Sequence, residues 1–331
     1  ARADEAARAA LLASQAAQDT VRLTVASDVA SGYFNLRALD HQVEIAERTL
    51  RARQDSYDLQ RAQYDNGVVT ELALRQAESE LAATRAQLPQ LRQQLGLQRN
   101  ALAVLLGRAP RALMADPIGR GQSVEMLPVP PVVPDFMPSA ILDRRPDIQQ
   151  AEQQLVAANA QIGVAKAAFY PNIALTGTLG RQSRELGDLF SNGTGIWGLA
   201  SSLTSPIFDF GRNQSNLEAS EARRQQALIT YGQTVRGAFR EVLDAFEKQQ
   251  GSTERLTAID GQVDALRRTV ELARDRYDGG YTSYIEVLDA QRTLFQAELD
   301  QSEALRDRLQ ASVELYKALG GGWSASAAAG R

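Results

Sequence analysis

Hydrophobic residues recur at helical spacing in the N-terminal part of the chain, in two stretches separated by a short break. The stretch from residue 1 to residue 64 contains no proline and one glycine, and its apolar residues lie three, four or seven positions apart. From about residue 70 to residue 106, leucine occupies every seventh position, at Leu74, Leu81, Leu88, Leu95 and Leu102. This spacing is typical of a coiled-coil seam. Because Asp65-Asn66-Gly67 lies between the two stretches, residues 1–107 predict a long antiparallel helical hairpin.

The second helix of this hairpin carries signals at both ends. Thr70 is expected to cap its N-terminus, and Gly107 is placed to end it. Pro89 lies inside it and is expected to kink the helix or to break its hydrogen bonding locally. At a rise of about 1.5 Å per residue the first helix would reach roughly 95 Å, a length that does not suit a compact globule.

A second pair of helical stretches occupies the C-terminal part of the chain. They run from about residue 211 to residue 277 and from about residue 283 to residue 319, with the break Asp278-Gly279-Gly280 between them. We therefore assign residues 209–320 to a second helical hairpin, followed by a tail over residues 321–331 for which no element is predicted.

The two hairpins match each other in register. Tyr277 aligns with Tyr64, 213 positions earlier, and without a gap the Asp-x-Gly breaks and the terminal Leu-Gly pairs align as well. Two unrelated alanine-rich coiled coils would share apolar positions but not these breaks, so the pattern indicates a tandem duplication. A short helix and two strands precede the second hairpin, whereas the first begins at residue 1. If the duplication is complete, a further N-terminal block is expected in the parent protein.

The segment between the hairpins has three parts. Residues 108–145 are expected to form an extended linker, because prolines concentrate there, at Pro110, Pro117, Pro128, Pro130, Pro131, Pro134 and Pro138. Residues 146–170 predict a short helix, in which Pro146 suits the first turn and Asp147 complements the helix dipole.

Residues 171–208 change to a period of two. Apolar residues or glycine alternate with small or polar residues, at Ile173, Leu175, Gly177 and Leu179 and again at Trp197, Leu199 and Leu203. Two strands of about ten residues with one apolar and one small-polar face fit a membrane hairpin whose second face lines a lumen. A surface hairpin packed on helices would show the same alternation. The charge-free run between Asp188 and Asp209 is too rich in glycine, serine and threonine for a membrane helix.

Composition removes most enzyme chemistry from consideration. The 331 residues contain 40 acidic and 36 basic side chains, with a net charge of −4, which argues against a nucleic-acid partner. There is no cysteine, and His41 is the single histidine, so disulfides, thiol nucleophiles, cysteine-ligated zinc and histidine-dependent triads are excluded. We predict no catalytic residue, no cofactor and no metal site, and the protein is not expected to be an enzyme.

Five short motifs carry a resemblance to a known family. They are Leu142-Asp143-Arg144-Arg145-Pro146-Asp147-Ile148, Ile162-Gly163-Val164-Ala165-Lys166-Ala167, Pro206-Ile207-Phe208-Asp209-Phe210-Gly211-Arg212, Arg276-Tyr277-Asp278-Gly279-Gly280 and Leu288-Asp289-Ala290-Gln291-Arg292. In this order and spacing the chain resembles the TolC-type outer-membrane efflux ducts. It is most similar to the OprM-like, NodT-type branch that serves multidrug pumps of the RND class.

The resemblance implies a mainly α fold with a small β part. Coiled-coil hairpins in tandem repeat would form a periplasmic α-barrel, and membrane β-strands would complete a trimeric barrel in the outer membrane. It implies a homotrimer in contact with outer-membrane lipid, a periplasmic adaptor (membrane fusion) protein as partner, and an inner-membrane pump as an indirect partner. The chain departs from the family pattern in having two strands instead of four and in lacking the cysteine that is usually lipid-modified in this branch, so it is expected to be a lipoprotein only if residues precede it.

The resemblance also implies two sets of functional residues. Ile285 and Asp289 match positions that line the closed periplasmic tip, where three carboxylates in a trimer would attract cations, repel anions and hold a gate. The helix–turn–helix tips are expected to meet the adaptor through Gly67, Val68, Val69, Thr70, Gly280, Tyr281, Thr282 and Ser283. For Asp289 the alternative is an ordinary solvated carboxylate, and for the tips it is a glycine required by any turn between helices.

Two functions follow as hypotheses. The first is an exit duct of a tripartite efflux system, which passively conducts small molecules or drugs to the exterior and opens at the periplasmic helix tips. The second is a periplasmic coiled-coil scaffold that does not span a membrane. The two amphipathic strands favour the duct, because a scaffold has no need of them.

Overall fold

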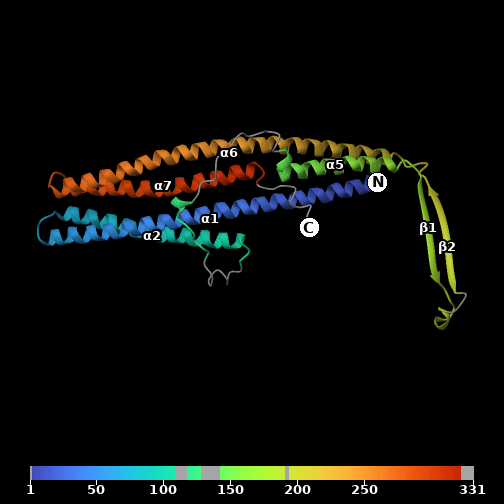
Figure 1. Cartoon of the computed structure of the whole chain (residues 1–331), viewed down its shortest axis with the longest axis horizontal. Helices are drawn as coiled ribbons and strands as arrows, with labels where there is room; N and C mark the ends of the chain where they lie inside the picture. Colours follow the sequence, from blue (N-terminus) through green and yellow to red (C-terminus); the bar gives the residue numbers. More distant parts are fainter. Residues whose placement is uncertain (1, 109–117, 128–141, 191–193, 322–331) are drawn as a thin grey trace. The chain divides into compact units, whose positions relative to one another are not determined.

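The computed structural model describes residues 2–108, 118–127, 142–190 and 194–321 (Figure 1). Its elements are α1 (Arg2–Asp65), α2 (Glu71–Leu105), η1 (Val124–Met126), α5 (Pro146–Ala167), β1 (Asn172–Arg181), η2 (Leu186–Asp188), β2 (Gly195–Thr204), α6 (Arg212–Asp278) and α7 (Tyr284–Ala318). The helices and strands predicted from periodicity are confirmed, with ends that differ by a few residues. Most of the proline-rich linker and nearly all of the tail lie outside the described residues, and the division of the chain into consecutive segments stays a prediction.

Contacts between backbones group the chain into two compact units. One unit contains residues 1–18 and 146–236, and the other contains residues 19–145 and 237–331. The long helices α1 and α6 each begin in the first unit and end in the second. In the part of the chain that the structure describes, no helix is both long enough and apolar enough to cross a membrane.

The second unit shows the predicted duplication residue by residue. Helices α2 and α7 both contain 35 residues and lie 213 positions apart at both ends, and the last residues of α1 and α6, Asp65 and Asp278, are also 213 positions apart. The residues before them, Thr70 and Ser283, have the same backbone angles, φ −80° and ψ 155°. The Thr70 hydroxyl accepts a hydrogen bond from the amide of Ala73, so the predicted N-cap is confirmed.

The turns of the two hairpins share their hydrogen bonds as well. At the first tip the amides of Gly67 and Val68 donate to the carbonyls of Tyr64 and Gln63, at 2.9 and 2.8 Å. The equivalent bonds at the second tip, from Gly280 and Tyr281 to Tyr277 and Arg276, have the same two lengths. Both are Schellman motifs, which need a left-handed residue after the helix. Gly67 and Gly280 supply it, with φ of 70° and 74°.

The interior of the second unit is built from the apolar seams of the four helix segments. One cluster near the tips joins Ala77 of α2 to residues of α6 and α7 that include Val270 and Val287. A second cluster includes Ile45, Leu88 and Phe295, and a third, which includes Leu36 and Leu102, covers Ile118. The predicted heptad leucines Leu74, Leu81, Leu88 and Leu102 are buried, while Leu95 is half-buried. Alanine is frequent among the buried residues, which lets long helices pack closely.

Helix α2 continues through Pro89 as one helix. Proline has no amide hydrogen, so the carbonyl four residues earlier receives no helical hydrogen bond from it. The neighbouring Leu88 and Leu91 are buried against α1 and α7, and this packing holds the helix together across the missing bond.

The Arg-Pro-Asp sequence at the start of α5 also holds the end of α7. Arg145 is buried and donates to the carbonyl of Ala318, the last residue of α7, at 3.0 Å. The same guanidinium forms an ion pair of 2.7 Å with Glu241 of α6. A cation at a helix C-terminus satisfies a carbonyl that has no helical partner and complements the dipole. The predicted role as a helix start is confirmed, and the structure adds this cap.

Strands β1 and β2 of the first unit form an antiparallel hairpin. The register pairs Ile173 with Leu203, Gly177 with Leu199 and Leu179 with Trp197. Paired residues share a face of the sheet, so the two predicted apolar faces combine into one. Nearly all residues of these strands are exposed, so little of their surface is covered by other described elements. The prediction of an amphipathic hairpin is confirmed, and packing on helices does not explain it.

Candidate functional site

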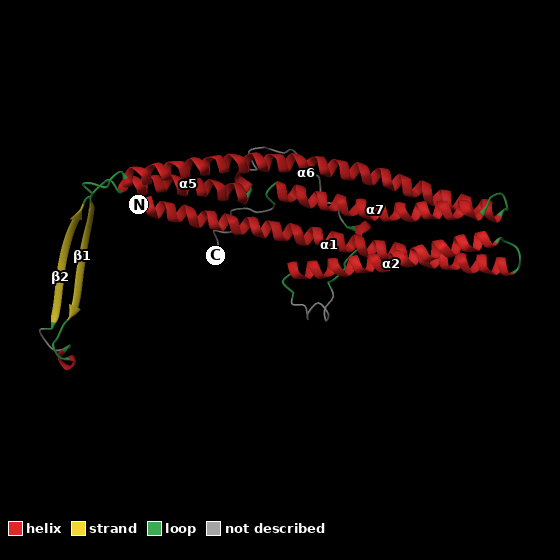
Figure 2. Cartoon of the chain, turned by 180° about the vertical axis from the view of Figure 1, so that it is seen from behind, coloured by secondary structure: helices red, strands yellow, loops and turns green. Residues whose placement is uncertain are grey.

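The two helix–turn–helix tips lie side by side in the second unit (Figures 1 and 2). The side-chain amide of Gln60 on α1 donates to the hydroxyl of Tyr277 on α6 at 3.0 Å. The ring of Tyr277 packs against that of Tyr284 on α7, with 5.2 Å between centroids. The duplication thus places the first hairpin directly against the second at the end where the predicted functional residues gather.

The residues predicted to meet a partner form the surface of these tips. Val68 and Tyr281 occupy equivalent positions and are 70% and 80% exposed, although both are large apolar side chains. Gly67, Gly280, Thr70 and Ser283 are exposed, and Val69 and Thr282 are half-buried. The two tips therefore present equivalent backbones with different side chains.

The two residues predicted to form a gate lie in the first turns of α7. Ile285 is 52% exposed, next to the buried Tyr284. Asp289 follows one turn later, and its carboxylate forms an ion pair with Arg292 of the same helix. Both charged side chains are more than 60% exposed. The structure brings Ile285 and Asp289 onto one open face of α7.

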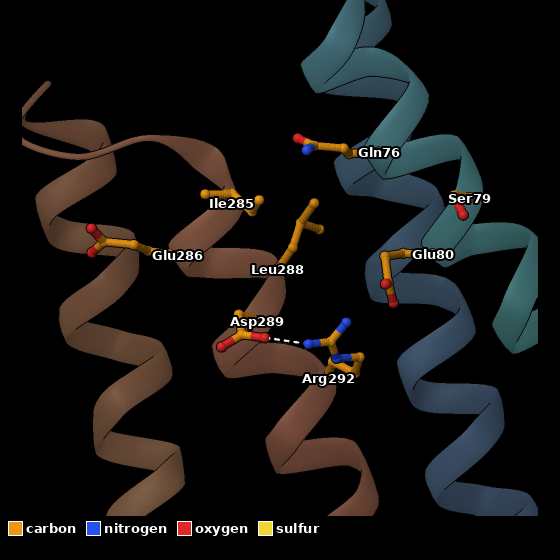
Figure 3. Close-up of a pocket in the computed structure, with 8 residues that line it drawn as sticks. All are labelled: Gln76, Ser79, Glu80, Ile285, Glu286, Leu288, Asp289 and Arg292. Carbon is orange, nitrogen blue, oxygen red and sulfur yellow. Dashed lines mark hydrogen bonds and ion pairs between the residues drawn. The ribbon is translucent and has the colours of Figure 1, made fainter.

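This face borders an open pocket of about 450 Å³ between α2 and α7 (Figure 3). Residues of α2 form one wall and residues of α7 the other, namely Gln76, Ser79, Glu80, Ile285, Glu286, Leu288, Asp289 and Arg292. Three carboxylates and one guanidinium line it, so the pocket is acidic overall. In Figure 3 the dashed line joins Asp289 to Arg292, which lies toward the α2 wall.

A buried arginine supports the α2 wall from behind. Arg53 of α1 is 6% exposed and donates to the carbonyl of Glu80 and to the Thr84 hydroxyl. It also forms an ion pair of 3.0 Å with the Glu80 carboxylate and lies over the ring of Phe295. Burial lowers the pKa of Arg53, an effect that the Glu80 carboxylate opposes. Glu80 is therefore held in place by a partner on its own hairpin.

The sequence matches a family model over most of its length. The model described as "Outer membrane efflux protein" covers residues 2–108 and 137–321. The chain belongs to the outer membrane efflux protein family.

Relatives within the outer membrane efflux protein family cover nearly the whole chain. The cation efflux system protein CusC of Escherichia coli O6:H1 is 39% identical over 321 residues, which are 96% of this chain and 68% of the relative. The solvent efflux pump outer membrane protein SrpC of Pseudomonas putida is 36% identical and is matched over 66% of its own length. The open-state structure of the MtrE outer membrane channel of Neisseria gonorrhoeae has a TM-score of 0.85 and 33% identity, with 97% of this chain and 71% of that chain covered.

Membership of the outer membrane efflux protein family confirms the predicted class and place of action. The chain is an outer-membrane efflux channel with a large helical part in the periplasm, and the scaffold hypothesis is not supported. The matched proteins are transport proteins rather than enzymes. Within the described residues no cluster of acidic or histidine side chains is arranged to hold a metal ion. The assignments of the gate and tip residues stay predictions.

Sequence reasoning assigned no role to Arg292, Arg53 or Gln60, which make side-chain contacts at the tip end of the second unit. Arg292 follows Asp289 by three positions, a spacing that brings side chains together on a helix, so the sequence did contain a signal for this pair. No such signal announces Arg53 or Gln60, because their contacts join residues that lie far apart along the chain.

Proposed function

We propose that this chain forms the exit duct of a tripartite efflux system, through which small molecules pass without chemical change. Three chains would surround the duct, with the β1–β2 hairpin crossing the outer membrane and the helices extending into the periplasm. The observation that carries the proposal is the paired arrangement of the two tips, which leaves Ile285 and Asp289 exposed on an open face beside them.

Helix length supports a duct that crosses a wide aqueous space. Helices α1 and α6 contain 64 and 67 residues. At about 1.5 Å per residue they measure roughly 96 and 100 Å. Their surfaces carry many ion pairs between residues three or four positions apart, such as Asp19 with Arg22 and Glu271 with Arg268. Such faces suit water on at least one side of the helices.

The gate proposal rests on how weakly Asp289 is held within its own chain. An exposed ion pair between residues three apart on a helix contributes only about 0.2–0.5 kcal/mol. Asp289 can therefore exchange Arg292 for a group on a neighbouring chain at little cost. Three copies of Asp289, with Ile285 one turn nearer the tip, would form an acidic and apolar constriction.

The tips are the proposed contact with a periplasmic adaptor protein, which links the duct to the inner-membrane pump that supplies the energy. Val68 and Tyr281 expose apolar surface at the outermost positions of the two turns. Gly67 and Gly280 have no side chain, so the backbone of a partner can approach closely. Because the two tips differ in side chains, we propose that one adaptor hairpin meets each of them.

Conductance tests the duct and the gate together. We would record single-channel currents in a planar bilayer for the wild type, Asp289→Ala and the matched control Asp19→Ala, which removes the same kind of pair between residues three apart on α1. We expect a small wild-type conductance that rises several-fold in Asp289→Ala and is unchanged in Asp19→Ala.

Two results would contradict the proposal. An inserted wild type whose conductance is the same with and without Asp289 would remove Asp289 from the gate. Absence of any current from wild type and both variants, with folding and membrane insertion verified, would argue against a duct.

A further inference from the structure

The apolar face of the β1–β2 hairpin ends at an arginine. Positions 173, 175, 177 and 179 of β1 lie on this face, and position 181, the last of the strand, continues the same alternation. That position is Arg181. The neighbouring large apolar side chains are exposed to the surroundings of the protein, with Leu179 91% and Trp197 81% exposed. A guanidinium therefore stands in line with large apolar side chains that the described residues leave mostly exposed.

The position of Arg181 along the strand matches the depth of a membrane. From Ile173 to Arg181 the strand rises about 27 Å, at roughly 3.4 Å per residue. Tilted by about 40°, as membrane strands are, this corresponds to roughly 20 Å across the bilayer, against an apolar band of about 25 Å. If Ile173 lies at one edge of the hydrocarbon, Arg181 lies at or just inside the other edge, within reach of the headgroups because a long side chain extends toward the interface.

The other end of the hairpin is also marked as an interface. Phe169 and Tyr170 precede β1, and Phe208 and Phe210 follow β2 in the same unit; Phe208 and Phe210 are almost completely exposed. The side-chain amide of Asn213 donates to the carbonyl of Ala168 at 3.2 Å, which ties the two connections together. Aromatic residues gather where membrane strands meet the headgroups. The aromatic end and the Arg181 end thus delimit one apolar face.

Local structure holds the guanidinium in position. Arg181 lies over the ring of Phe190, 5.7 Å from its centroid, a distance typical of a cation–π contact. The ladder continues one step beyond the strand, because the amide of Gln182 donates to the carbonyl of Thr194 at 2.9 Å. This pairing fixes the backbone next to Arg181, whose exposed side chain stays accessible to an anion.

We infer that Arg181 binds a phosphate group of a lipid headgroup in the outer leaflet of the membrane. The guanidinium offers several donors in a fixed plane and pairs with phosphate through two parallel hydrogen bonds. A phospholipid or other phosphorylated lipid matches both the apolar face and the guanidinium. Its acyl chains would cover Leu179 and Trp197, and its phosphate would bind Arg181. The inference rests on the proposed function, because it requires the hairpin to lie in the bilayer.

Trp197 provides a local probe for a test. It lies on the same face as Arg181, diagonal to it across the ladder, and the chain contains one other tryptophan, Trp323. In a Trp323→Phe background we would place the full chain in phosphatidylcholine bilayers and measure Trp197 fluorescence. Brominated acyl chains test insertion. Titration with bis-phosphorylated lipid A and with its dephosphorylated form, in separate samples, tests the headgroup.

We expect Trp197 to be quenched by brominated chains and to respond to phosphorylated lipid A at about tenfold lower concentration than to the dephosphorylated lipid. Arg181→Gln should remove the preference for phosphorylated lipid A and keep the quenching by brominated chains. Arg181→Lys should retain part of the preference. Arg184→Gln removes the same charge in the connection beyond the strand and should keep the preference. Inorganic phosphate should not abolish it at concentrations equal to the lipid.

The outcomes separate this inference from the proposed function. Quenching without any preference for the phosphorylated lipid, or a preference that survives Arg181→Gln, overturns the inference and leaves the duct standing. Absence of quenching in the wild type shows that the hairpin is outside the bilayer and overturns both.

Discussion

Replacing Arg145 by methionine tests how the α5 motif stabilises the second hairpin. Methionine keeps most of the buried length of the side chain but removes the charge and the donors. The carbonyl of Ala318 then loses a charge-assisted hydrogen bond of 3.0 Å, and Glu241 loses an ion pair of 2.7 Å. The hydrogen bond reaches the last residue of α7, and the ion pair reaches α6.

The structure gives the size of the effect. A hydrogen bond from a charged group to a buried carbonyl contributes about 1.5–3 kcal/mol. The Glu241 pair adds less than about 1 kcal/mol, because the Glu241 side chain is 53% exposed. A cation at the helix C-terminus adds roughly 0.3–1 kcal/mol. We therefore expect Arg145→Met to lower the free energy of unfolding by about 3 kcal/mol, with Arg145→Lys intermediate.

Circular dichroism during heating of the detergent-solubilised protein measures the change, and hydrogen exchange locates it. The expected loss corresponds to a decrease of roughly 4 °C in Tm, with faster exchange at the last two turns of α7. Arg144→Met is the control, because Arg144 precedes Arg145 in the same motif and is exposed. A Tm for Arg145→Met within about 1 °C of that control would refute the proposed cap.

Two further predictions concern backbone strain and pH. Gly67→Ala and Gly280→Ala should each lower the free energy of unfolding by about 1–2 kcal/mol, because an L-residue is strained at their positive φ while an added Cβ meets no atom. The control Gly237→Ala, within α6, should raise the free energy of unfolding by about 0.5–1 kcal/mol. Equal effects of all three substitutions in urea unfolding would contradict this prediction. Burial raises the pKa of Tyr284 above its ordinary value of 10, so unfolding releases a proton above pH 10 and stability falls there as pH rises. When Tm is measured from pH 8 to 11, the Tm of Tyr284→Phe should therefore fall less above pH 10 than that of the wild type. An equal fall in the wild type and the variant would show that Tyr284 does not contribute.

Local signals in the sequence were sufficient to place the helices and strands. Glycine after a helix permits a left-handed residue, and threonine before one accepts an amide hydrogen bond, so Gly67 and Thr70 mark their turn without reference to the rest of the chain. The offset between the hairpins was visible for the same reason, because each copy carries its own set of these signals. Alternation in β1 and β2 likewise revealed which residues share a face.

The sequence also identified candidate functional residues, but it did not reveal which other side chains surround them. Asp289 was identified through its match to a family motif, and its position on an exposed face followed only from the packing of α7. Arg145 was predicted to mark a helix start, whereas its contact with Ala318 joins residues at the two ends of the second half of the chain. Periodicity does not report such distant pairs, because it describes one element at a time.

By itself the sequence determined the elements, their duplication and the chemistry that is excluded, because helix caps, heptads, glycine turns and the lack of cysteine are local properties. The tertiary structure decided which surfaces remain uncovered. It placed the tips of two hairpins together, buried Arg53 behind Glu80, and left the face that ends at Arg181 without a protein partner among the described residues. Burial and exposure depend on contacts between distant segments, and these form only when the helices and strands pack against one another.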